Sequence, residues 1–271
     1  MPADPSPEAT SELVARLRAA GCVFAEDEAR LLIAAASTPA DLAAMADRRV
    51  AGLPLEQVIG WAGFCGLRIA VAPGVFVPRR RTEFLVQRAV ALASGAGGSG
   101  GPPVIVDLCC GTGAVAAVLA AALHPAEVHA SDVDPAAVAC ARRNLEAAGG
   151  RVYQGDLYAP LPAGLRGRVT LLAANVPYIP TGQIGLLPAE ARLHEPRVAL
   201  DGGADGLDVL RRVAEAAPEW LAPRGHLLTE TSERQAPRAA EIIAGSGLAA
   251  EVVSSDELSA TVVTGTRPAG R

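Results

Sequence analysis

The chain has 271 residues, of which 50% are hydrophobic and 20% charged, and its formal net charge is -5. This composition is ordinary for a globular protein and leaves room for one large and one small domain. The acidic balance is a poor match for the phosphate backbone of a nucleic acid, unless a local basic patch compensates. No uncharged apolar run approaches the length of a membrane span, and residues 1–12 lack the basic and apolar parts of a signal peptide. We therefore expect a cytoplasmic protein with no membrane partner.

The cysteines and histidines argue against disulfides and metal sites. The five cysteines include no CxxC pair and are odd in number, which indicates free thiols in a reducing cytosol. Cys109 and Cys110 are adjacent and could oxidise, but two small residues packed at a turn are the simpler interpretation. The four histidines have no ligand-like spacing, so we expect no metal.

The first part of the chain predicts a small helical bundle. Ser6-Pro7-Glu8 is typical of a helix start, with a cap, a proline at the first helical position and an acid in the first turn. Thr38-Pro39 repeats the cap and the proline. The predicted helices are 6–21, 25–36 and a third from Thr38 that is interrupted or restarted at Leu53-Pro54. We assign residues 1–60 to an N-terminal helical domain that docks the substrate.

Residues 61–93 predict a linker made of a β-hairpin and a helix. The stretch GFCGLRIAVAPGVFVPRR alternates apolar with small or polar residues around Pro73-Gly74, which predicts a hairpin with its turn at 72–75. Thr82-Glu83 then opens a helix that runs to about Ala93. The glycine-rich residues 94–103 predict an exposed loop.

From there to the end, strands alternate with helices. The run VIVDL is continuously apolar apart from its Asp, as expected for a strand buried on both faces. Alternation of this kind favours a doubly wound, Rossmann-like α/β fold of about seven strands, with the last two antiparallel because too few residues separate them for a crossover. Within the proposed catalytic domain, 94–271, the strands are 104–108, 127–132, 151–156, 169–175, 225–231, 250–258 and 259–267, the helices are 114–123, 135–148, 206–221 and 234–245, and 181–206 is a long loop.

A glycine turn after the first of these strands predicts a nucleoside-binding site. Gly111 and Gly113 let the backbone approach a ligand and let the following helix pack closely. Asp132 ends the second strand, where an acid can accept from both ribose hydroxyls, and Asp156 could accept from an adenine amino group. The same turn satisfies the dinucleotide pattern GxGxxA. Asp107, placed to neutralise a ligand's amino group, and the antiparallel strand pair favour S-adenosylmethionine (SAM) over NAD.

The stretch Asn175-Val176-Pro177-Tyr178 ends the fourth strand and should face the same crevice. An amide or exocyclic amine nitrogen is a weak nucleophile, so a methyl-transfer site must orient it and stabilise its developing charge. Asn175 Oδ1 can accept one N–H and the Val176 carbonyl the other, because Pro177 holds its predecessor extended. Tyr178 can stack on the flat substrate. An ordinary strand-ending turn is the structural alternative.

At these residues the chain resembles the release factor glutamine N5-methyltransferases, and the resemblance covers nearly its whole length. VDLCCGTGAVA is similar to the family's SAM loop, and NVPY to its catalytic motif. PGVFVPRRRTEFLV (73–86) resembles the family's linker hairpin, HEPRVALDGGADGLDVLRR (194–212) its EP-x-x-AL-x-GG-x-DGL segment, and LAPRGHLLTETSERQ (221–235) a strand that normally ends in E-x-G-x-x-Q.

The resemblance implies transfer of a methyl group from SAM to the side-chain amide of the glutamine in the GGQ loop of a peptide chain release factor, with S-adenosyl-L-homocysteine as the product. We further expect a monomer. Carried over position by position, Asn175, Val176, Pro177 and Tyr178 hold the glutamine; Asp107, Cys109, Gly111, Gly113, Asp132, Asp156 and Asn175 contact SAM; and Arg79, Thr82 and Glu83 line the entrance.

Several departures from the family pattern indicate a divergent member. Val176 stands where a proline is usual, although only its carbonyl is required. Cys109 replaces the first glycine of the SAM turn, which implies strain if the position has positive φ. Arg80 replaces a proline, and Thr231-Ser232 replaces the usual x-Gly.

Two other functions stay open from the sequence. An amino-methyltransferase acting on adenine, cytosine or guanine uses the same Asn-Pro-Tyr chemistry but needs a basic track, for which the arginines 79–81 are the one candidate. A SAM-binding scaffold that docks a partner through the N-terminal helices would need no turnover. The loop 181–206 is long enough to gate a substrate.

Overall fold

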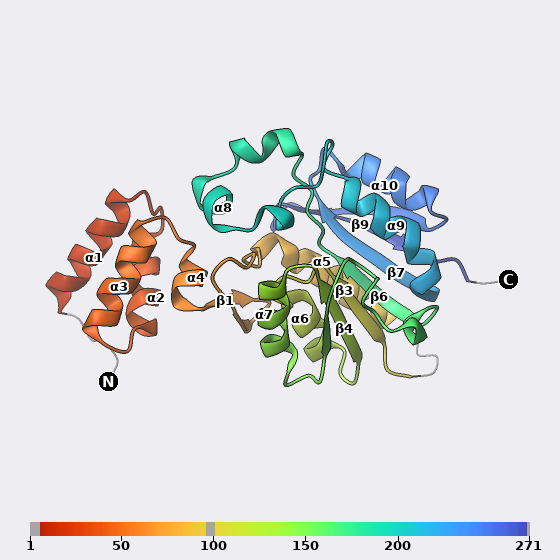
Figure 1. The fold of residues 1–271 in the computed structure, drawn as a ribbon, viewed down its shortest axis with the longest axis horizontal. Coiled ribbons are helices and arrows are strands. Elements are labelled where there is room, and N and C mark those ends of the chain that lie inside the picture. Colours follow the sequence, from red (N-terminus) through yellow and green to blue (C-terminus); the bar gives the residue numbers. More distant parts are fainter. Residues whose placement is uncertain (1–5, 96–100, 270–271) are drawn as a thin grey trace.

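The computed structural model describes residues 6–95 and 101–269. Part of the loop predicted at 94–103 and the first residues of the chain therefore lie outside the described residues. A helical bundle lies at one end of the molecule and a larger α/β body at the other (Figure 1). In the described ranges, no helix is both long and apolar enough to cross a membrane.

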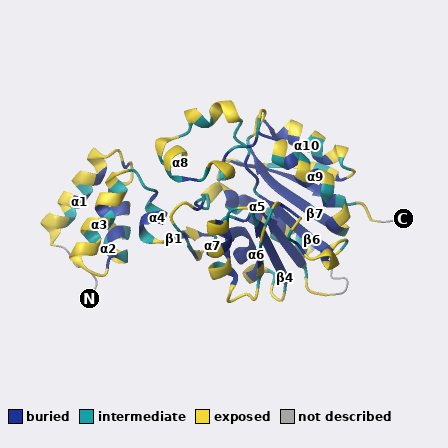
Figure 2. Cartoon of the chain, viewed as in Figure 1, coloured by how far each residue is buried: buried dark blue, intermediate teal, exposed yellow. Residues whose placement is uncertain are grey.

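The bundle forms where the sequence places caps and apolar stripes. The Ser6 hydroxyl accepts from the Ala9 amide at 3.3 Å, and the Thr38 hydroxyl accepts from the Asp41 amide at 3.1 Å. Leu13, Leu17 and Leu32 are buried between the helices, whose outer faces are exposed (Figure 2). The helices are α1 (Pro7–Ala19), α2 (Ala25–Ala35), α3 (Pro39–Val50) and the short α4 (Leu55–Ile59).

The β-hairpin of the linker lies earlier than predicted. Its strands β1 (Trp61–Phe64) and β2 (Leu67–Ala70) pair antiparallel around Cys65-Gly66. Both turn residues have positive φ, 46° and 76°, as a tight two-residue hairpin turn requires. The turn predicted at 72–75 exists, with the Val75 amide 3.2 Å from the Ala72 carbonyl, but it does not join the two strands. The prediction failed because Pro-Gly is a stronger turn signal than Cys-Gly.

The body is a seven-stranded sheet in the order β5-β4-β3-β6-β7-β9-β8, and β9 runs antiparallel to both of its neighbours. The predicted doubly wound fold with a terminal antiparallel pair is confirmed. The strands are β3 (Val104–Leu108), β4 (Glu127–Asp132), β5 (Arg151–Gln154), β6 (Val169–Ala174), β7 (Leu221–Thr231), β8 (Ala249–Ser255) and β9 (Ala260–Thr266).

Helices cover both faces of this sheet. On one face pack α5 (Glu83–Gly95), α6 (Ala114–Ala122) and α7 (Pro135–Leu145), and on the other α9 (Asp208–Trp220) and α10 (Ala236–Gly245). The central strands are buried on both sides, and every residue of β3 is buried (Figure 2). The order in which the chain adds strands changes side between β3 and β6: β4 and β5 lie on one side of β3, and β6 and the later strands lie on the other. The carboxyl ends of the parallel strands β3 and β6 therefore flank the crevice in which such folds bind ligands.

The segment 181–206, predicted as an irregular loop, contains three short helical turns and arches over one end of the sheet (Figure 1). They are η3 (Thr181–Leu186), α8 (Ala189–His194) and η4 (Arg197–Ala199), and a proline stands immediately before each: Pro180, Pro188 and Pro196. Proline favours the backbone geometry of a helix entrance, so this regular spacing is the signal that the prediction overlooked.

Candidate active site

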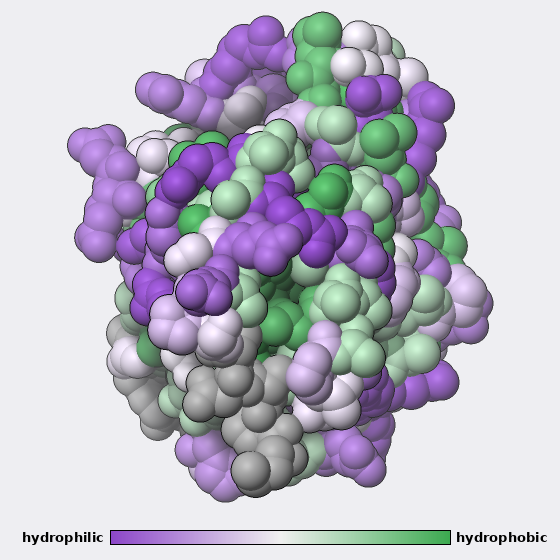
Figure 3. Space-filling model, turned by 90° about the vertical axis from the view of Figure 1, so that its left-hand side faces the viewer, coloured by the Kyte–Doolittle hydropathy of each residue, from purple (hydrophilic) through white to green (hydrophobic). Residues whose placement is uncertain are grey.

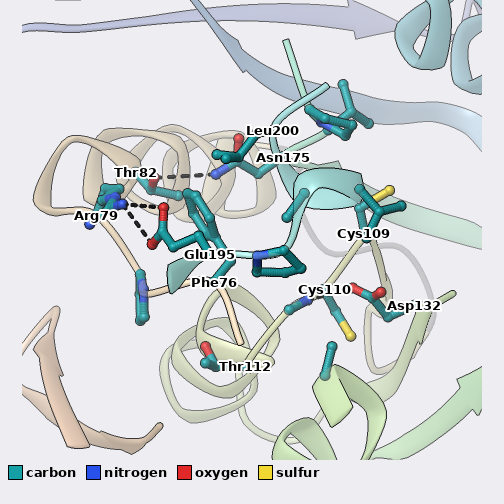
Figure 4. Close-up of a pocket in the computed structure, with 18 of the residues that line it drawn as sticks. Phe76, Arg79, Thr82, Cys109, Cys110, Thr112, Asp132, Asn175, Glu195 and Leu200 are labelled. Carbon is teal, nitrogen blue, oxygen red and sulfur yellow. Dashed lines mark hydrogen bonds and ion pairs between the residues drawn. The ribbon is translucent and has the colours of Figure 1, made fainter. Parts of the chain in front are cut away.

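A cavity of about 630 Å³ lies at the carboxyl ends of the central strands. Its walls come from the linker, the turn after β3, the ends of β4 and β6, the segment 187–200 and β7. Eleven of the thirteen predicted site positions line it: Arg79, Thr82, Asp107, Cys109, Gly111, Asp132, Asp156, Asn175, Val176, Pro177 and Tyr178. Figure 4 shows Arg79, Thr82, Asn175 and Glu195 grouped on one side, and Cys109, Cys110 and Asp132 on the other.

The turn after β3 is a run of left-handed residues. Cys109, Gly111 and Gly113 have φ values of 54°, 55° and 75°. A glycine adopts this conformation without strain, whereas a cysteine in it costs on the order of 1 kcal/mol. The strain expected at Cys109 is therefore present in the structure.

The two glycines of the turn have different surroundings. A Cβ on Gly111 would meet nothing within 4 Å, and its amide donates to Asp132 Oδ2 at 2.8 Å. Gly113 does not line the cavity. A Cβ there would lie 3.0 Å from the Cβ of Ala141, so Gly113 lets α6 pack against α7. Gly111 therefore leaves room for a ligand in the cavity, whereas Gly113 allows two helices to pack closely.

Asp107 is a buried carboxyl at the end of β3. It is 1% exposed and accepts a hydrogen bond from the Ala116 amide at 3.1 Å. Burial, and to a smaller extent the nearby charge of Asp132, raise the pKa of Asp107 to about 7. An amino group bound beside it would stabilise its ionised form.

Two further carboxylates follow β4 and β5. Asp132 accepts from the amides of Gly111 and Asp134 at 2.8 and 2.9 Å, and burial raises its pKa. Asp156 lies at a more open position, where Arg212 Nη2 of α9 contacts it at 2.5 Å. Both retain lone pairs for the hydroxyl and amino groups of a ligand.

On the opposite side of the cavity, Asn175 follows the last residue of β6. Its Nδ2 donates to Thr82 Oγ1 at 3.3 Å (Figure 4), and Thr82 in turn donates to Glu230 Oε2 at 2.6 Å. Among the described residues, none donates a hydrogen bond to Asn175 Oδ1 or to the Val176 carbonyl. Two acceptors on adjacent residues of the cavity wall therefore have lone pairs that no described residue uses.

Tyr178 is held by the same carboxylate. Its hydroxyl donates to Glu230 Oε1 at 3.0 Å, and the Arg81 guanidinium lies 5.8 Å from the centre of its ring. Burial, and next the negative charge of Glu230, raise the pKa of Tyr178 well above its ordinary value. Tyr178 thus stays a neutral phenol throughout the usual pH range.

Two segments that the sequence prediction did not assign to the site hold the backbone of the NVPY turn and of Ile179 in place. Gln235 Nε2 donates to the Tyr178 carbonyl at 2.9 Å, and the Gly202 amide donates to the Ile179 carbonyl at 2.9 Å. A Cβ on Gly202 would lie 2.6 Å from the Pro177 carbonyl, and one on Gly206 would collide with the Tyr178 carbonyl. Close approach of backbones is the reason for glycine at both positions.

Two of the three arginines at positions 79–81 are paired with buried glutamates. Arg79 Nη2 contacts both oxygens of Glu195, at 2.7 and 2.6 Å, and the Glu195 side chain is fully buried. Arg81 Nε contacts Glu230 at 2.9 Å. Glu83, predicted at the entrance, does not line the cavity. Its carboxylate instead accepts from the Cys65 amide at 2.9 Å, which ties α5 to the hairpin.

The comparisons with known proteins point to methyltransferases. The family model described as "Methyltransferase small domain" matches residues 68–178. The release factor glutamine methyltransferase of Geobacter sulfurreducens is 40% identical to this chain over 203 residues, which are 73% of this chain and 68% of that protein. The chain belongs to the release factor glutamine methyltransferase family. Other bacterial members match at 34–39% identity.

One further relative bears a different name, and a solved structure agrees in fold. The 4-amino-L-phenylalanine/4-methylamino-L-phenylalanine methyltransferase of Streptomyces pristinaespiralis is 39% identical over 189 residues, which are 69% of this chain and 64% of that protein. A solved methyltransferase structure from Pyrococcus furiosus has a TM-score of 0.53 at 18% identity and covers 75% of this chain and 90% of that one, which supports the fold alone.

The structure accommodates the departures from the family pattern. Val176 is 3% exposed and packs into the core, and its carbonyl accepts no hydrogen bond from the described residues. Ser232, at the usual glycine, donates to Gln235 Oε1 at 2.6 Å and so orients the amide that braces Tyr178. Thr231 is buried, and its hydroxyl has no partner among the described residues. The structure offers no reason for that hydroxyl.

Proposed function

We propose that this protein transfers a methyl group from SAM to the side-chain amide nitrogen of the glutamine in the GGQ loop of a peptide chain release factor. The observation that carries the proposal is the pair of available acceptors, Asn175 Oδ1 and the Val176 carbonyl, across one cavity from the carboxylates Asp107 and Asp132. Family membership supports this choice, since the relatives of 34–40% identity bear that activity in their names.

The residues of the turn after β3 fit SAM as the methyl donor. The open space over Gly111 admits a ligand against the backbone, Asp107 offers a carboxylate to an ammonium group, and Asp132 offers lone pairs to ribose hydroxyls. When bound, SAM supplies an electrophilic methyl group on a sulfonium and leaves as S-adenosyl-L-homocysteine.

The acceptor half of the cavity orients a primary amide. Asn175 Oδ1 and the Val176 carbonyl accept its two N–H groups, which places the nitrogen in one orientation and stabilises positive charge as it develops there. Pro177 restricts Val176 to extended geometry, and Tyr178 offers its ring face to the flat amide. A strong base is unnecessary, because the charge lost from the sulfonium appears on the nitrogen and the proton can leave afterwards.

We also propose that the N-terminal helices dock the release factor beside the cavity. These helices contact the segment 181–206 through an ion pair between Arg49 and Glu190 at 3.1 Å. The side chain of Gln57 also donates to the carbonyls of Val75 in the linker and His194 in that segment. Seen from this end, the surface is mostly hydrophilic with scattered apolar side chains (Figure 3). A substrate protein bound to these helices would lie next to the segment 181–206, which arches over the cavity.

Two observations bear on other acceptors. Pairing of Arg79 and Arg81 with buried glutamates neutralises two of the three arginines of the candidate basic patch, which disfavours a nucleic acid. The Streptomyces pristinaespiralis relative favours a second candidate, a small aromatic amine, because an aryl NH₂ presents the same two N–H groups to the same acceptors.

A panel of acceptors tests the proposal. The protein is incubated with methyl-labelled SAM and one of four acceptors: a release factor, the same release factor with its loop glutamine replaced by alanine, 4-amino-L-phenylalanine, or RNA. We expect label in the intact release factor and not in the alanine variant. Label in the amine or the RNA alone would overturn the proposed substrate, and no label in any acceptor would favour the scaffold interpretation.

A further inference from the structure

The buried carboxylate of Glu230 contacts Tyr178 directly and is connected to Asn175 through Thr82. Glu230, near the end of β7, is 2% exposed and receives three hydrogen bonds. The donors are Arg81 Nε at 2.9 Å, Thr82 Oγ1 at 2.6 Å and the Tyr178 hydroxyl at 3.0 Å. The linker, β7 and the turn after β6 therefore meet at one side chain, although more than fifty residues separate each segment from the next.

The chemistry of these donors fixes the direction of every hydrogen bond. An ionised carboxylate only accepts, so the single hydroxyl proton of Thr82 is committed to Glu230. The Thr82 oxygen then has only lone pairs to offer to Asn175. The Asn175 atom that faces it must therefore be the NH₂ group, and the side-chain oxygen must point the other way.

That orientation matters for the proposed reaction. With Oδ1 turned toward the substrate, Asn175 accepts an N–H of the glutamine amide. With the amide flipped, an NH₂ group would face another NH₂ group, which is repulsive. An asparagine with no fixed partner on its far side has no strong preference between the two. We propose that Glu230 is a positioning residue that acts through Thr82 to hold Asn175 in its accepting orientation and directly on Tyr178 to hold its ring.

This inference rests on the proposed function, because it assumes an acceptor that donates N–H groups. A purely structural role is the alternative. In that case the ion pair between Arg81 and Glu230 would anchor the linker to β7, and Thr82 would fill space beside it. The two roles predict different responses when Thr82 is changed, because a structural anchor does not require its hydroxyl.

Kinetics of matched variants separate these roles. Glu230→Gln removes the charge, Thr82→Val removes the hydroxyl, and Thr82→Ser restores it. Arg81→Met breaks the ion pair and the contact with the Tyr178 ring but leaves Thr82 and Glu230 in place. We expect Glu230→Gln and Thr82→Val to lower kcat by at least about tenfold, with the Kd of SAM changed less than about twofold. Thr82→Ser should keep most of the turnover that Thr82→Val loses, and Arg81→Met should lower kcat less than Glu230→Gln does.

A double variant tests whether the two residues act in series. If Glu230 works through Thr82, then Glu230→Gln combined with Thr82→Val lowers kcat by clearly less than the product of the two single effects. Thr264→Val, a buried threonine of β9 that does not line the cavity, is the control for general loss of stability and should leave kcat unchanged. Full activity in Thr82→Val, or equal losses in Glu230→Gln and Arg81→Met, would overturn the proposal.

A readout without any methyl acceptor distinguishes failure of this inference from failure of the proposed function. The side-chain amide signals of Asn175 are assigned in ¹⁵N NMR spectra by their absence from Asn175→Ala. We expect them to shift in Thr82→Val and Glu230→Gln and to stay near their wild-type positions in Thr82→Ser. Unshifted signals would show that Glu230 does not act on Asn175 through Thr82. If the shifts are present but the wild-type protein methylates no release factor, only the proposed substrate is refuted.

Discussion

The two sides of the cavity are built in different ways. Most of the cofactor side comes from one stretch of chain, from Asp107 to Asp132, in which a left-handed turn exposes backbone and two carboxylates remain available. Asp156 is added from the segment that follows β5. The acceptor side is assembled from four distant segments, which the buried carboxylates of Glu195 and Glu230 hold together. Figure 4 shows the contact of Glu195 with Arg79. Under the proposed function, a largely local motif binds the nucleoside of SAM, whereas orientation of a weak nucleophile relies on long-range contacts.

If this division is correct, the largest effect comes from removing the acceptor on the Asn175 side chain. Asn175→Ala should lower kcat by about a hundredfold, because the substrate nitrogen loses its orientation and its charge stabilisation. Calorimetry should show an almost unchanged Kd for SAM. A parallel loss of SAM affinity would break the comparison, because Asn175 would then belong to both sides.

The next effect should fall on the cofactor side. Asp132→Ala should raise the Kd of SAM about thirtyfold, since a charged acceptor of ribose hydroxyls is lost. Asp132→Asn keeps one oxygen and serves as the matched variant, with an intermediate Kd. Unchanged affinity in both variants would show that the ribose is held elsewhere.

A smaller effect should appear in the pH dependence of SAM binding. The pKa of Asp107 is raised to about 7, and that of Asp132 is raised as well, so both carboxyls bind protons more tightly in the folded state than in the unfolded state. As pH falls through 7 the Asp107 carboxylate is lost, and the Kd of SAM should rise roughly five- to tenfold between about pH 7.3 and pH 6. For the free protein, the same shifts make the free energy of unfolding fall as pH rises toward 7.

The control for this profile is Asp107→Asn, which cannot ionise. Calorimetric titrations of the variant should show a flatter pH dependence than those of the wild-type protein. If both profiles have the same slope, another group controls SAM binding, and the role assigned to Asp107 is wrong.

The smallest effect concerns the strained cysteine. Cys109→Gly should stabilise the protein by less than about 1 kcal/mol, because relief of the left-handed strain is largely offset by the greater chain entropy of glycine in the unfolded state. Urea unfolding measures this difference. A loss of more than about 2 kcal/mol would show that packing of the Cys109 side chain outweighs its strain.

The fold was predictable because its signals are local. Continuous apolar strands, proline-capped helices and the short connection between β8 and β9 each occur within a few residues. The hairpin was misplaced because Cys65 is an unusual residue for positive φ. The helical turns after Pro180, Pro188 and Pro196 were overlooked because each is too short to show an apolar periodicity.

The site was predictable on its cofactor side, at the NVPY turn, and at Arg79 and Thr82 of the linker. Asp107, Gly111 and Asn175 follow strands, and the topology brings strand ends together. Nothing in the neighbourhood of Glu230 or Gln235 shows that their side chains reach back to Thr82 and Tyr178, because the pairing depends on the register of β7 against β6. Glu83 and Gly113 lie on the right segments, but their surroundings direct them to the hairpin and to α7.

Peptide mapping of a methylated release factor tests the central claim most directly. After incubation with SAM and the protein, the release factor is digested and the methyl group is located by mass spectrometry. The proposed function predicts a single methyl on the side-chain nitrogen of the GGQ glutamine, present with the wild-type protein and nearly absent with Asn175→Ala. A methyl on any other residue, or equal yields with the two proteins, would contradict it.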